Sequence, residues 1–180
     1  NDMAISSLTM TPPKGITCGY VPLGGVIVSE EIASYFDDHP LLCGLTYSAH
    51  PISCAAGIAT IDVYKEENLL QNSKNMGKVL GEELEKLKEK HACVGDVRYI
   101  GLFSAVELVK DKKTKEALVP YGSDPERIMP KIIKMLFEKG FSTYSHENNV
   151  IVAPPLIIKE NELKEAMLVL DDVLGWVDSY

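Results

Sequence analysis

The order of hydrophobic patterns from residue 69 onward is the feature that most restricts how this 180-residue chain can fold. Residues 69–90 carry leucines at helical spacing with glutamate and lysine opposite, and residues 160–177 carry a second apolar stripe. Between them, residues 94–109 are typical of strands with a break at Gly101, and residues 142–145 and 150–153 flank a polar turn. The order predicts an α+β unit, an antiparallel sheet with helices on one side.

One more helix is expected inside this unit. Residues 123–126 match a capping box and predict a helix that runs to Lys139, with Gly140 at its end. Pro130 falls inside that helix and is expected to kink or restart it. The segment before it, residues 110–122, is a polar excursion.

The first part of the chain predicts one strand and two helices. Residues 23–29 form a compact apolar run without alternation, which favours a strand buried on both faces. Ser29 is expected to cap a short helix over residues 30–36, with acidic residues in its first turn. Pro51 suits the first position of a second helix, whose residues 53–59 are mostly small. Small residues let another backbone approach, so we expect this helix to pack deep in the protein or at a subunit interface.

Lys14 stands in an unusual place for a lysine. It follows two prolines and precedes a glycine, in a segment poor in other charge. The prolines stiffen the approach and the glycine permits a turn, so the backbone is shaped around the amine. An amine in a partly apolar pocket has a lowered pKa, and its neutral form can attack a carbonyl to form a Schiff base. The alternative is a solvated surface charge, which is the ordinary role of a lysine.

A possible anion site precedes the helix that starts at Pro51. Thr46, Tyr47 and Ser48 place hydroxyl groups just before the free N–H groups of the helix N-terminus. The same hydroxyls could instead only cap the helix. Both interpretations follow from the local sequence.

Charge and composition exclude several classes of partner. The formal net charge of −8 disfavours nucleic acid and anionic membranes, whose recognition depends on clustered lysine and arginine. No apolar run reaches the roughly 18 residues of a membrane span, and the N-terminus lacks a signal-peptide pattern, so a cytoplasmic protein is expected. The cysteines and histidines are scattered, which predicts neither a metal site nor a disulfide framework.

Four segments, in this order, strongly resemble the class III aminotransferases, which are fold-type I pyridoxal-phosphate enzymes that include ω-amino-acid transaminases. The segments read KGIT from Lys14, GYVPLGG from Gly19, GLTYSAHP from Gly44 and APPL from Ala153. The resemblance implies that Lys14 carries pyridoxal 5'-phosphate as a Schiff base. It also implies that Thr46 binds the cofactor phosphate of the neighbouring subunit in a homodimer.

The resemblance also assigns two further residues and two domains. Tyr20 would line the approach to the cofactor, and Arg98 would have a structural role or contact substrate at the site entrance. Residues 1–75 would be the C-terminal part of the α/β large domain, and residues 76–180 the small α+β domain. In the family the phosphate cup, the stacking aromatic residue and the aspartate at the pyridine nitrogen precede the lysine. We therefore expect this chain alone to be incomplete and inactive, and residues 25–28 either to expose apolar surface or to pair with another chain.

The resemblance implies transfer of an amino group from an ω-amino acid or amine to a 2-oxo acid such as pyruvate. Ile151 stands where relatives that act on ornithine commonly have an arginine, so an α-carboxylate clamp is not expected there. Two alternatives stay open: a pyridoxal-phosphate-dependent aminomutase or similar isomerase of the same superfamily, and a non-catalytic truncated domain.

Overall fold

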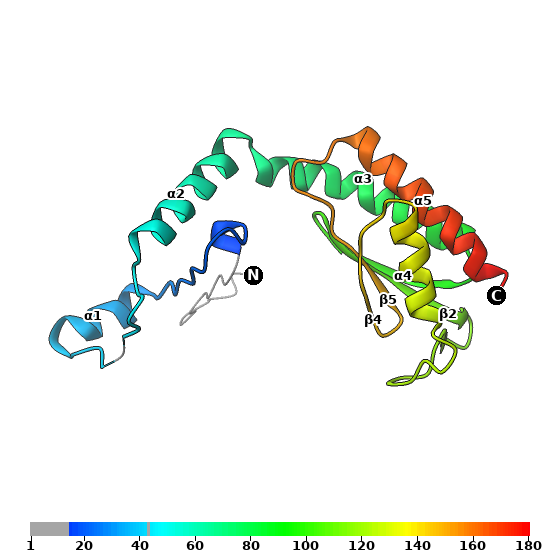
Figure 1. Ribbon diagram of the computed structural model, residues 1–180, viewed down its shortest axis with the longest axis horizontal. Helices are drawn as coiled ribbons and strands as arrows, with labels where there is room; N and C mark the ends of the chain where they lie inside the picture. Colours follow the sequence, from blue (N-terminus) through cyan, green and yellow to red (C-terminus); the bar gives the residue numbers. More distant parts are fainter. Residues whose placement is uncertain (1–14, 43) are drawn as a thin grey trace. The chain divides into compact units, whose positions relative to one another are not determined.

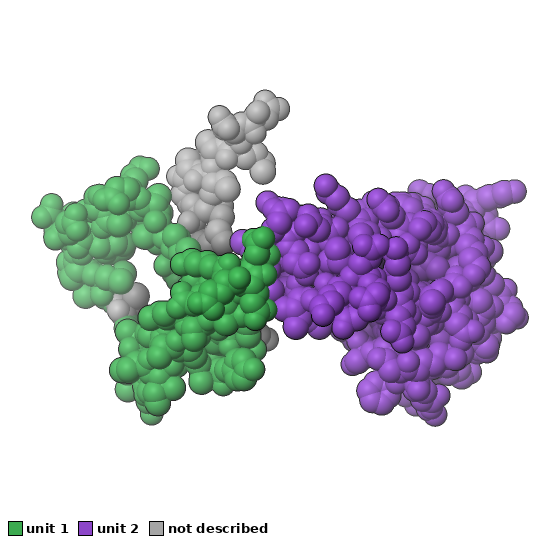
Figure 2. All heavy atoms as spheres, turned by 90° about the horizontal axis from the view of Figure 1, so that it is seen from above, with its two compact units in different colours: residues 1–68 green, residues 69–180 purple. Residues whose placement is uncertain are grey.

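The computed structural model describes residues 15–42 and 44–180 and divides the chain into two compact units (Figures 1 and 2). Unit 1 is Asn1–Asn68 and unit 2 is Leu69–Tyr180. The described part of unit 1 contains a 3-10 helix, η1 (Gly15–Thr17), and two α-helices, α1 (Glu30–Asp38) and α2 (Pro51–Glu66). Among the described residues, no helix is both long enough and apolar enough to cross a membrane.

The strand expected over residues 23–29 is wrong for the described structure. Ile27 forms one isolated bridge, and the segment otherwise has no regular secondary structure. Val26, Ile27 and Val28 are exposed, Ile27 to 62%. An apolar run becomes a buried strand only where neighbouring strands cover it. The exposure of these three residues confirms the expectation of exposed apolar surface here.

Both helices of unit 1 form, but the expected capping of α1 by Ser29 is wrong. Ser29 precedes α1 without a side-chain capping bond, and its hydroxyl is buried with no partner among the described residues. The small-faced helix α2 is not deeply packed within its own chain, because Gly57 is its one buried residue in this structure, and the expected alternative of a subunit interface stays a prediction.

Unit 2 has the expected α+β organisation. Its elements, in chain order, are α3 (Leu69–Lys90), β1 (Val94–Ile100), β2 (Phe103–Asp111), β3 (Glu116–Ala117), α4 (Ile128–Glu138), β4 (Ser145–His146), β5 (Asn149–Val152) and α5 (Glu160–Asp178). The sheet order is β1-β2-β5-β4, with β3 paired to β2, and every pairing is antiparallel. The polar excursion after β2 thus contributes a short strand, β3, that the sequence pattern did not predict.

The core of unit 2 lies between one face of this sheet and the three helices (Figure 1). Along β2, Ser104, Val106 and Leu108 are buried while Phe103 is exposed, as the alternation of a one-sided sheet requires. The helices contribute the apolar stripes that the sequence predicts. The largest fully buried side chains include Leu80, Leu84, Val94, Val106, Leu108, Ile132, Leu136, Val150, Leu163, Leu170, Val173 and Leu174.

Helix α4 begins later than its sequence pattern suggests. Ser123 is not its N-cap; the carboxylate of Asp124 instead accepts hydrogen bonds from the amides of Ile128 and Met129, at 2.8 and 2.9 Å. Pro130 therefore lies in the first turn, where its missing N–H costs nothing, so it has no need to kink the helix. The expected end is confirmed, with Gly140 at a φ of 86° directly after the C-cap residue.

Asn148 holds the segment between β3 and α4 against the core. Its side-chain oxygen accepts from the amide of Val119 at 2.7 Å, and its side-chain nitrogen donates to the carbonyl of Val119 at 3.0 Å. The Asn148 carbonyl also accepts from the amide of Leu108 at 2.8 Å. The buried side-chain amide of Asn148 thus pairs with the backbone N–H and C=O of Val119, as a neighbouring strand would.

Two glycines of α3 let the helix lie directly on the β1–β2 hairpin. A Cβ at Gly77 would lie 2.6 Å from the Cα of Gly101, and one at Gly81 would lie 2.4 Å from the ring of Tyr99. Gly101 itself has a φ of 54°, which suits glycine in the turn between the strands. The contact is therefore set by the backbone and leaves no room for a side chain at Gly77.

We predict that Gly77→Ala lowers the free energy of unfolding by about 2 kcal/mol, because its methyl group meets backbone atoms that cannot move aside. Urea denaturation of the full chain measures this. The control is Gly175→Ala in α5, where no atom lies within 4 Å of the added Cβ. That variant should be unchanged or gain up to about 1 kcal/mol from helix propensity. Equal stability of the two variants would contradict the packing account.

A buried histidine joins the end of α3 to α5. His91 is 3% exposed, with Nε2 2.8 Å from Asp171 Oδ1 and Nδ1 2.6 Å from Asp178 Oδ2. Lys90 also donates to Asp171, and the amide of Cys93 donates to Asp178 at 2.8 Å. Both ring nitrogens can donate at once only when the ring carries both protons.

These contacts lower the pKa of both aspartates. For Asp171 the main cause is the hydrogen bond from Lys90, with His91 adding to it. For Asp178 burial raises the pKa, but the hydrogen bonds from the Cys93 amide and His91 outweigh burial and lower it. A folded pKa below the unfolded value of about 3.9 means that this stabilisation is present at neutral pH and is lost as pH falls through the folded pKa.

We predict that the free energy of unfolding falls as pH is lowered from about 7 to about 3, and that Asp171→Asn reduces this fall because one linked carboxylate is gone. Urea unfolding across the pH series gives both slopes. Asp172→Asn is the matched control, since this exposed carboxylate pairs with Lys139 at the surface, and it should keep the wild-type slope. A wild-type slope in Asp171→Asn would refute the linkage.

Candidate functional site

Lys14 lies outside the described residues, and the segment that follows it forms the 3-10 helix η1. Helix η1 begins at Gly15 and packs on α2 within unit 1. The contact is at Gly57, where an added Cβ would lie 3.0 Å from Leu23 Cδ2 and 3.8 Å from the carbonyl oxygen of Ile16. Gly57 therefore leaves room on α2 for the side chain of Leu23, with η1 at ordinary contact distance beside it.

A tight turn follows η1 and is held by one buried hydroxyl. Thr17 is 0% exposed, and its Oγ1 donates to the carbonyl of Val21 at 2.6 Å. The amide of Tyr20 donates to the Thr17 carbonyl at 3.0 Å, and Cys18 and Gly19 take positive φ angles of 50° and 80°. Tyr20 is 86% exposed in this structure.

Thr46 lies in a second turn, just before α2. The amide of Leu45 donates to Ser48 Oγ at 3.2 Å, and the Ser48 amide returns a bond to the Leu45 carbonyl at 2.9 Å. Ala49 follows with a φ of 53°. Thr46 is exposed, and its hydroxyl has no partner among the described residues.

The N-terminus of α2 supplies further hydrogen-bond donors. His50 occupies the N-cap position without a side-chain cap, and Pro51 is the first helical residue. The amides of Ile52 and Ser53 therefore lack a capping side chain, and the first turn contains no acidic residue. The hydroxyl groups upstream do not cap this helix in the structure. An exposed hydroxyl in the turn that leads into uncapped helix amides supplies the kinds of donor that bind a phosphate, so these residues fit the expected cofactor.

Helix α2 is thus the common support of the two candidate segments. The turn that carries Thr46 leads into its first residue, Pro51, and η1 rests on it at Gly57. Pro51 and Gly57 are six residues apart, which corresponds to about 9 Å along the axis of α2. A glycine inside a helical pattern is a sequence signal for such a contact, although here it stands among several other small residues.

Arg98, the other candidate, belongs to β1 of unit 2. Its guanidinium donates to Glu107 Oε2 at 2.5 Å, to Asp96 Oδ2 at 3.2 Å and to Asn149 Oδ1 at 2.6 Å. The hydrogen bond to Glu107 is the main reason that the pKa of Arg98 is raised. The arginine thus ties three strands together, and its charge is already balanced by two carboxylates of its own sheet. No group of three or more potential metal ligands occurs among the residues that the structure describes.

We predict that Gly57→Val separates η1 from α2, because the added side chain meets Leu23 and Ile16. The amides of Cys18 and Tyr20, which hold the turn after η1, should then exchange with solvent about tenfold faster in hydrogen-exchange measurements. Gly44→Ala is the control, since no atom lies within 4 Å of its added Cβ. Unchanged protection in Gly57→Val would show that η1 does not depend on this contact.

Comparison with known proteins confirms the family. The family model described as Aminotransferase class-III matches residues 3–174. A structure of taurine:2-oxoglutarate aminotransferase from Bifidobacterium kashiwanohense, in complex with PLP and glutamate, is 50% identical, with a TM-score of 0.88. The alignment covers 93% of this chain and 37% of that one. The match at this identity confirms the expected fold class, the C-terminal part of a PLP-transferase large domain followed by an α+β domain.

Two curated relatives give the same result. Adenosylmethionine-8-amino-7-oxononanoate aminotransferase of Methanocaldococcus jannaschii is 37% identical over 155 residues, 83% of this chain and 32% of the relative. Ethanolamine-phosphate phospho-lyase homolog 1 of Caenorhabditis elegans is 34% identical over 177 residues, 93% of this chain and 34% of the relative. The chain spans about a third of the length of the relatives it matches. It belongs to the class III aminotransferases, a family of pyridoxal-phosphate enzymes.

Proposed function

We propose that this chain carries part of the active site of a pyridoxal-phosphate-dependent aminotransferase, which moves an amino group from an ω-amino acid or amine to a 2-oxo acid such as pyruvate. One observation carries the proposal: the segment that follows Lys14 and the turn that holds Thr46 are both fixed to α2. It supports the proposal because both segments match the family's cofactor-site motifs, and α2 is the helix that η1 contacts and that the Thr46 turn leads into.

Each of these residues has a distinct role in the proposal. Lys14 holds the cofactor covalently at rest, and its freed amine then moves a proton at the substrate carbon that bears the nitrogen. Thr46 Oγ1 and the amides of Ile52 and Ser53 hold the phosphate. Pyridoxal phosphate, when bound, supplies the electron sink that makes the carbon–hydrogen bond of the substrate acidic. The protein residues supply position and proton transfer.

The lysine and the phosphate-binding threonine of one cofactor site can come from different chains. We propose that the protein is a homodimer in which Lys14 of one protomer and Thr46 of its partner serve the same cofactor. The exposed side chains of α2, such as Ile52 and Ile58, support the proposal because they leave a wide face for the second protomer. The expected cytoplasmic location and the division into a large domain over residues 1–75 and a small domain over residues 76–180 belong to the same proposal.

The proposed substrate class depends on the absence of an arginine at position 151, where this chain has Ile151. This residue lies in β5, and an isoleucine cannot pair with a carboxylate. A solved structure at 50% identity is of a taurine:2-oxoglutarate aminotransferase, and taurine is an aminosulfonate that has no α-carboxylate. Both points favour ω-amino donors. Tyr20 as a wall of the pocket and Arg98 as an entrance residue remain proposals, and Arg98 would have to leave Glu107 to bind a substrate carboxylate.

We predict that Lys14 is the lysine bound to the cofactor. Borohydride reduction of an active preparation loaded with pyridoxal phosphate, followed by peptide mapping, should find the label on Lys14. Lys65, a lysine on α2, serves as an internal control and should stay unlabelled. A label on any other lysine would overturn the assignment.

We also predict the donor class. In a screen with pyruvate and 2-oxoglutarate as acceptors, β- and γ-amino acids, aminosulfonates and simple amines should react faster than acetylornithine, because Ile151 offers no clamp for an α-carboxylate. Measurement of the amino acid formed from the acceptor also separates transfer from an aminomutase, which would release no such product. A strong preference for acetylornithine would refute the donor assignment.

A further inference from the structure

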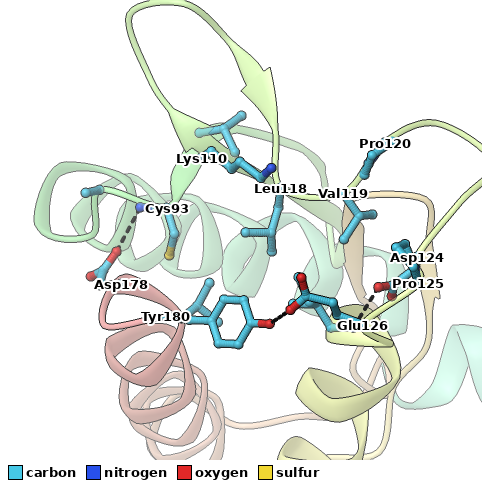
Figure 3. Close-up of a pocket in the computed structure, with 14 residues that line it drawn as sticks. Cys93, Lys110, Leu118, Val119, Pro120, Asp124, Pro125, Glu126, Asp178 and Tyr180 are labelled. Carbon is cyan, nitrogen blue, oxygen red and sulfur yellow. Dashed lines mark hydrogen bonds between the residues drawn. The ribbon is translucent and has the colours of Figure 1, made fainter.

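A cavity of about 440 Å³ lies within unit 2, and none of the candidate site residues lines it (Figure 3). It is bounded by the end of β2, the segment between β3 and α4, and the C-terminal turn of α5. Its volume falls within the range of small-molecule sites, which is roughly 300–1,000 Å³. The proposed catalytic chemistry uses none of these residues.

The floor of the cavity is apolar and rigid. Leu118, Val119, Ile128 and Val177 line it, and each is less than 10% exposed. Cys93 also lines it, and burial raises the pKa of its thiol, so the sulfur stays protonated and uncharged. Val119 is held in place by the two hydrogen bonds from Asn148. The floor is therefore preformed and suits an apolar segment of a ligand.

Four charged side chains line the walls, and two of them have their carboxylate oxygens engaged. Asp178 binds His91 and the amide of Cys93, and Asp124 binds the first amides of α4. These two carboxylates are structural parts of the wall. The groups with spare bonding capacity are the other two, Lys110 and Glu126.

Lys110 and Glu126 carry opposite charges on opposite sides of the cavity. In the view of Figure 3, Lys110 lies above Leu118, and Glu126 lies below it beside Tyr180. Glu126 uses Oε2 to accept a hydrogen bond from the Tyr180 hydroxyl, so Oε1 remains for a second donor. The ammonium of Lys110 has one distant ion pair, 3.5 Å to Glu116, on the exposed β3 strand. Each can bind one end of a ligand whose middle lies on the apolar floor.

We propose that this cavity binds a small linear molecule with a carboxylate at one end, an amine at the other and a short apolar chain between them. The carboxylate pairs with Lys110, the amine pairs with Glu126 and Tyr180, and the methylene groups lie on Leu118 and Val119. A ligand with one charged end would leave one of the two wall charges without a partner, so both ends contribute to affinity.

The test is titration of the ¹⁵N-labelled full chain with 4-aminobutanoate, 6-aminohexanoate and 8-aminooctanoate, without added pyridoxal phosphate. At least one should shift the amides of Val119, Glu126 and Tyr180 in a saturable way. The amides of Tyr20 and Ser48 in the candidate active site should not move. Hexanoate and hexylamine, each with one charged end, should bind about tenfold more weakly than the best two-ended ligand.

Substitutions locate the two ends. Lys110→Met and Glu126→Gln should each weaken the best ligand about tenfold. Lys113 and Glu165 are exposed and lie outside the cavity lining. The control substitutions Lys113→Met and Glu165→Gln should therefore leave the affinity for the best ligand unchanged. The proposal is overturned if none of the three ligands gives saturable shifts at the cavity. It is equally overturned if hexanoate or hexylamine binds as tightly, or if both cavity variants retain wild-type affinity.

Discussion

The close contact between α3 and the β1–β2 hairpin is the constraint on which the rest of unit 2 depends. Gly77 and Gly81 remove the side chains that would hold the helix away from Gly101 and Tyr99. With the helix this close, Leu80 and Leu84 reach the core and become fully buried. Because protein interiors are close-packed, the position of α3 in turn fixes where α5 can lie. The His91 cluster then joins the ends of the two helices.

The same device recurs in unit 1, where Gly57 admits η1 and Leu23 to the surface of α2. There it serves the candidate site, because η1 begins directly after Lys14. A helix with little buried apolar surface can still position a functional segment if one contact is closely fitted. The two contacts differ in kind, because the nearest atom at Gly77 is backbone at 2.6 Å, whereas at Gly57 it is the end of the Leu23 side chain at 3.0 Å.

Local patterns predicted much of the fold. Helix α3 spans Leu69–Lys90 as its leucine spacing indicates, and Gly101 separates β1 from β2 as expected. The predictions from sequence fail where the local structure depends on residues outside the local pattern. Residues 23–29 have strand composition, but composition does not supply neighbouring strands. The start of α4 was misplaced because Asp124, one residue beyond the expected N-cap, provides the capping carboxylate. The Asn148 contact with Val119 joins residues far apart in the sequence, which no periodicity can reveal.

The sequence motifs name the candidate site residues, and the structure adds the setting of those that it describes. The motif around Thr46 indicated an anion site, and the structure adds that no side chain caps α2. Arg98 was weighed as a possible substrate contact, but the sequence could not show that Glu107, Asp96 and Asn149 surround its guanidinium. These partners come from three different strands, so only the sheet register brings them together.

The central claim is that one cofactor is served by Lys14 of one protomer and Thr46 of its partner. The most direct test mixes two weakened variants, Lys14→Ala and Thr46→Val, under conditions that let protomers exchange in an active preparation. Mixed dimers contain one intact site and one site that lacks both groups. The account predicts recovery of up to roughly a quarter of wild-type transaminase activity, because about half of randomly formed dimers are mixed. Activity equal to the mean of the two separate variants would contradict it.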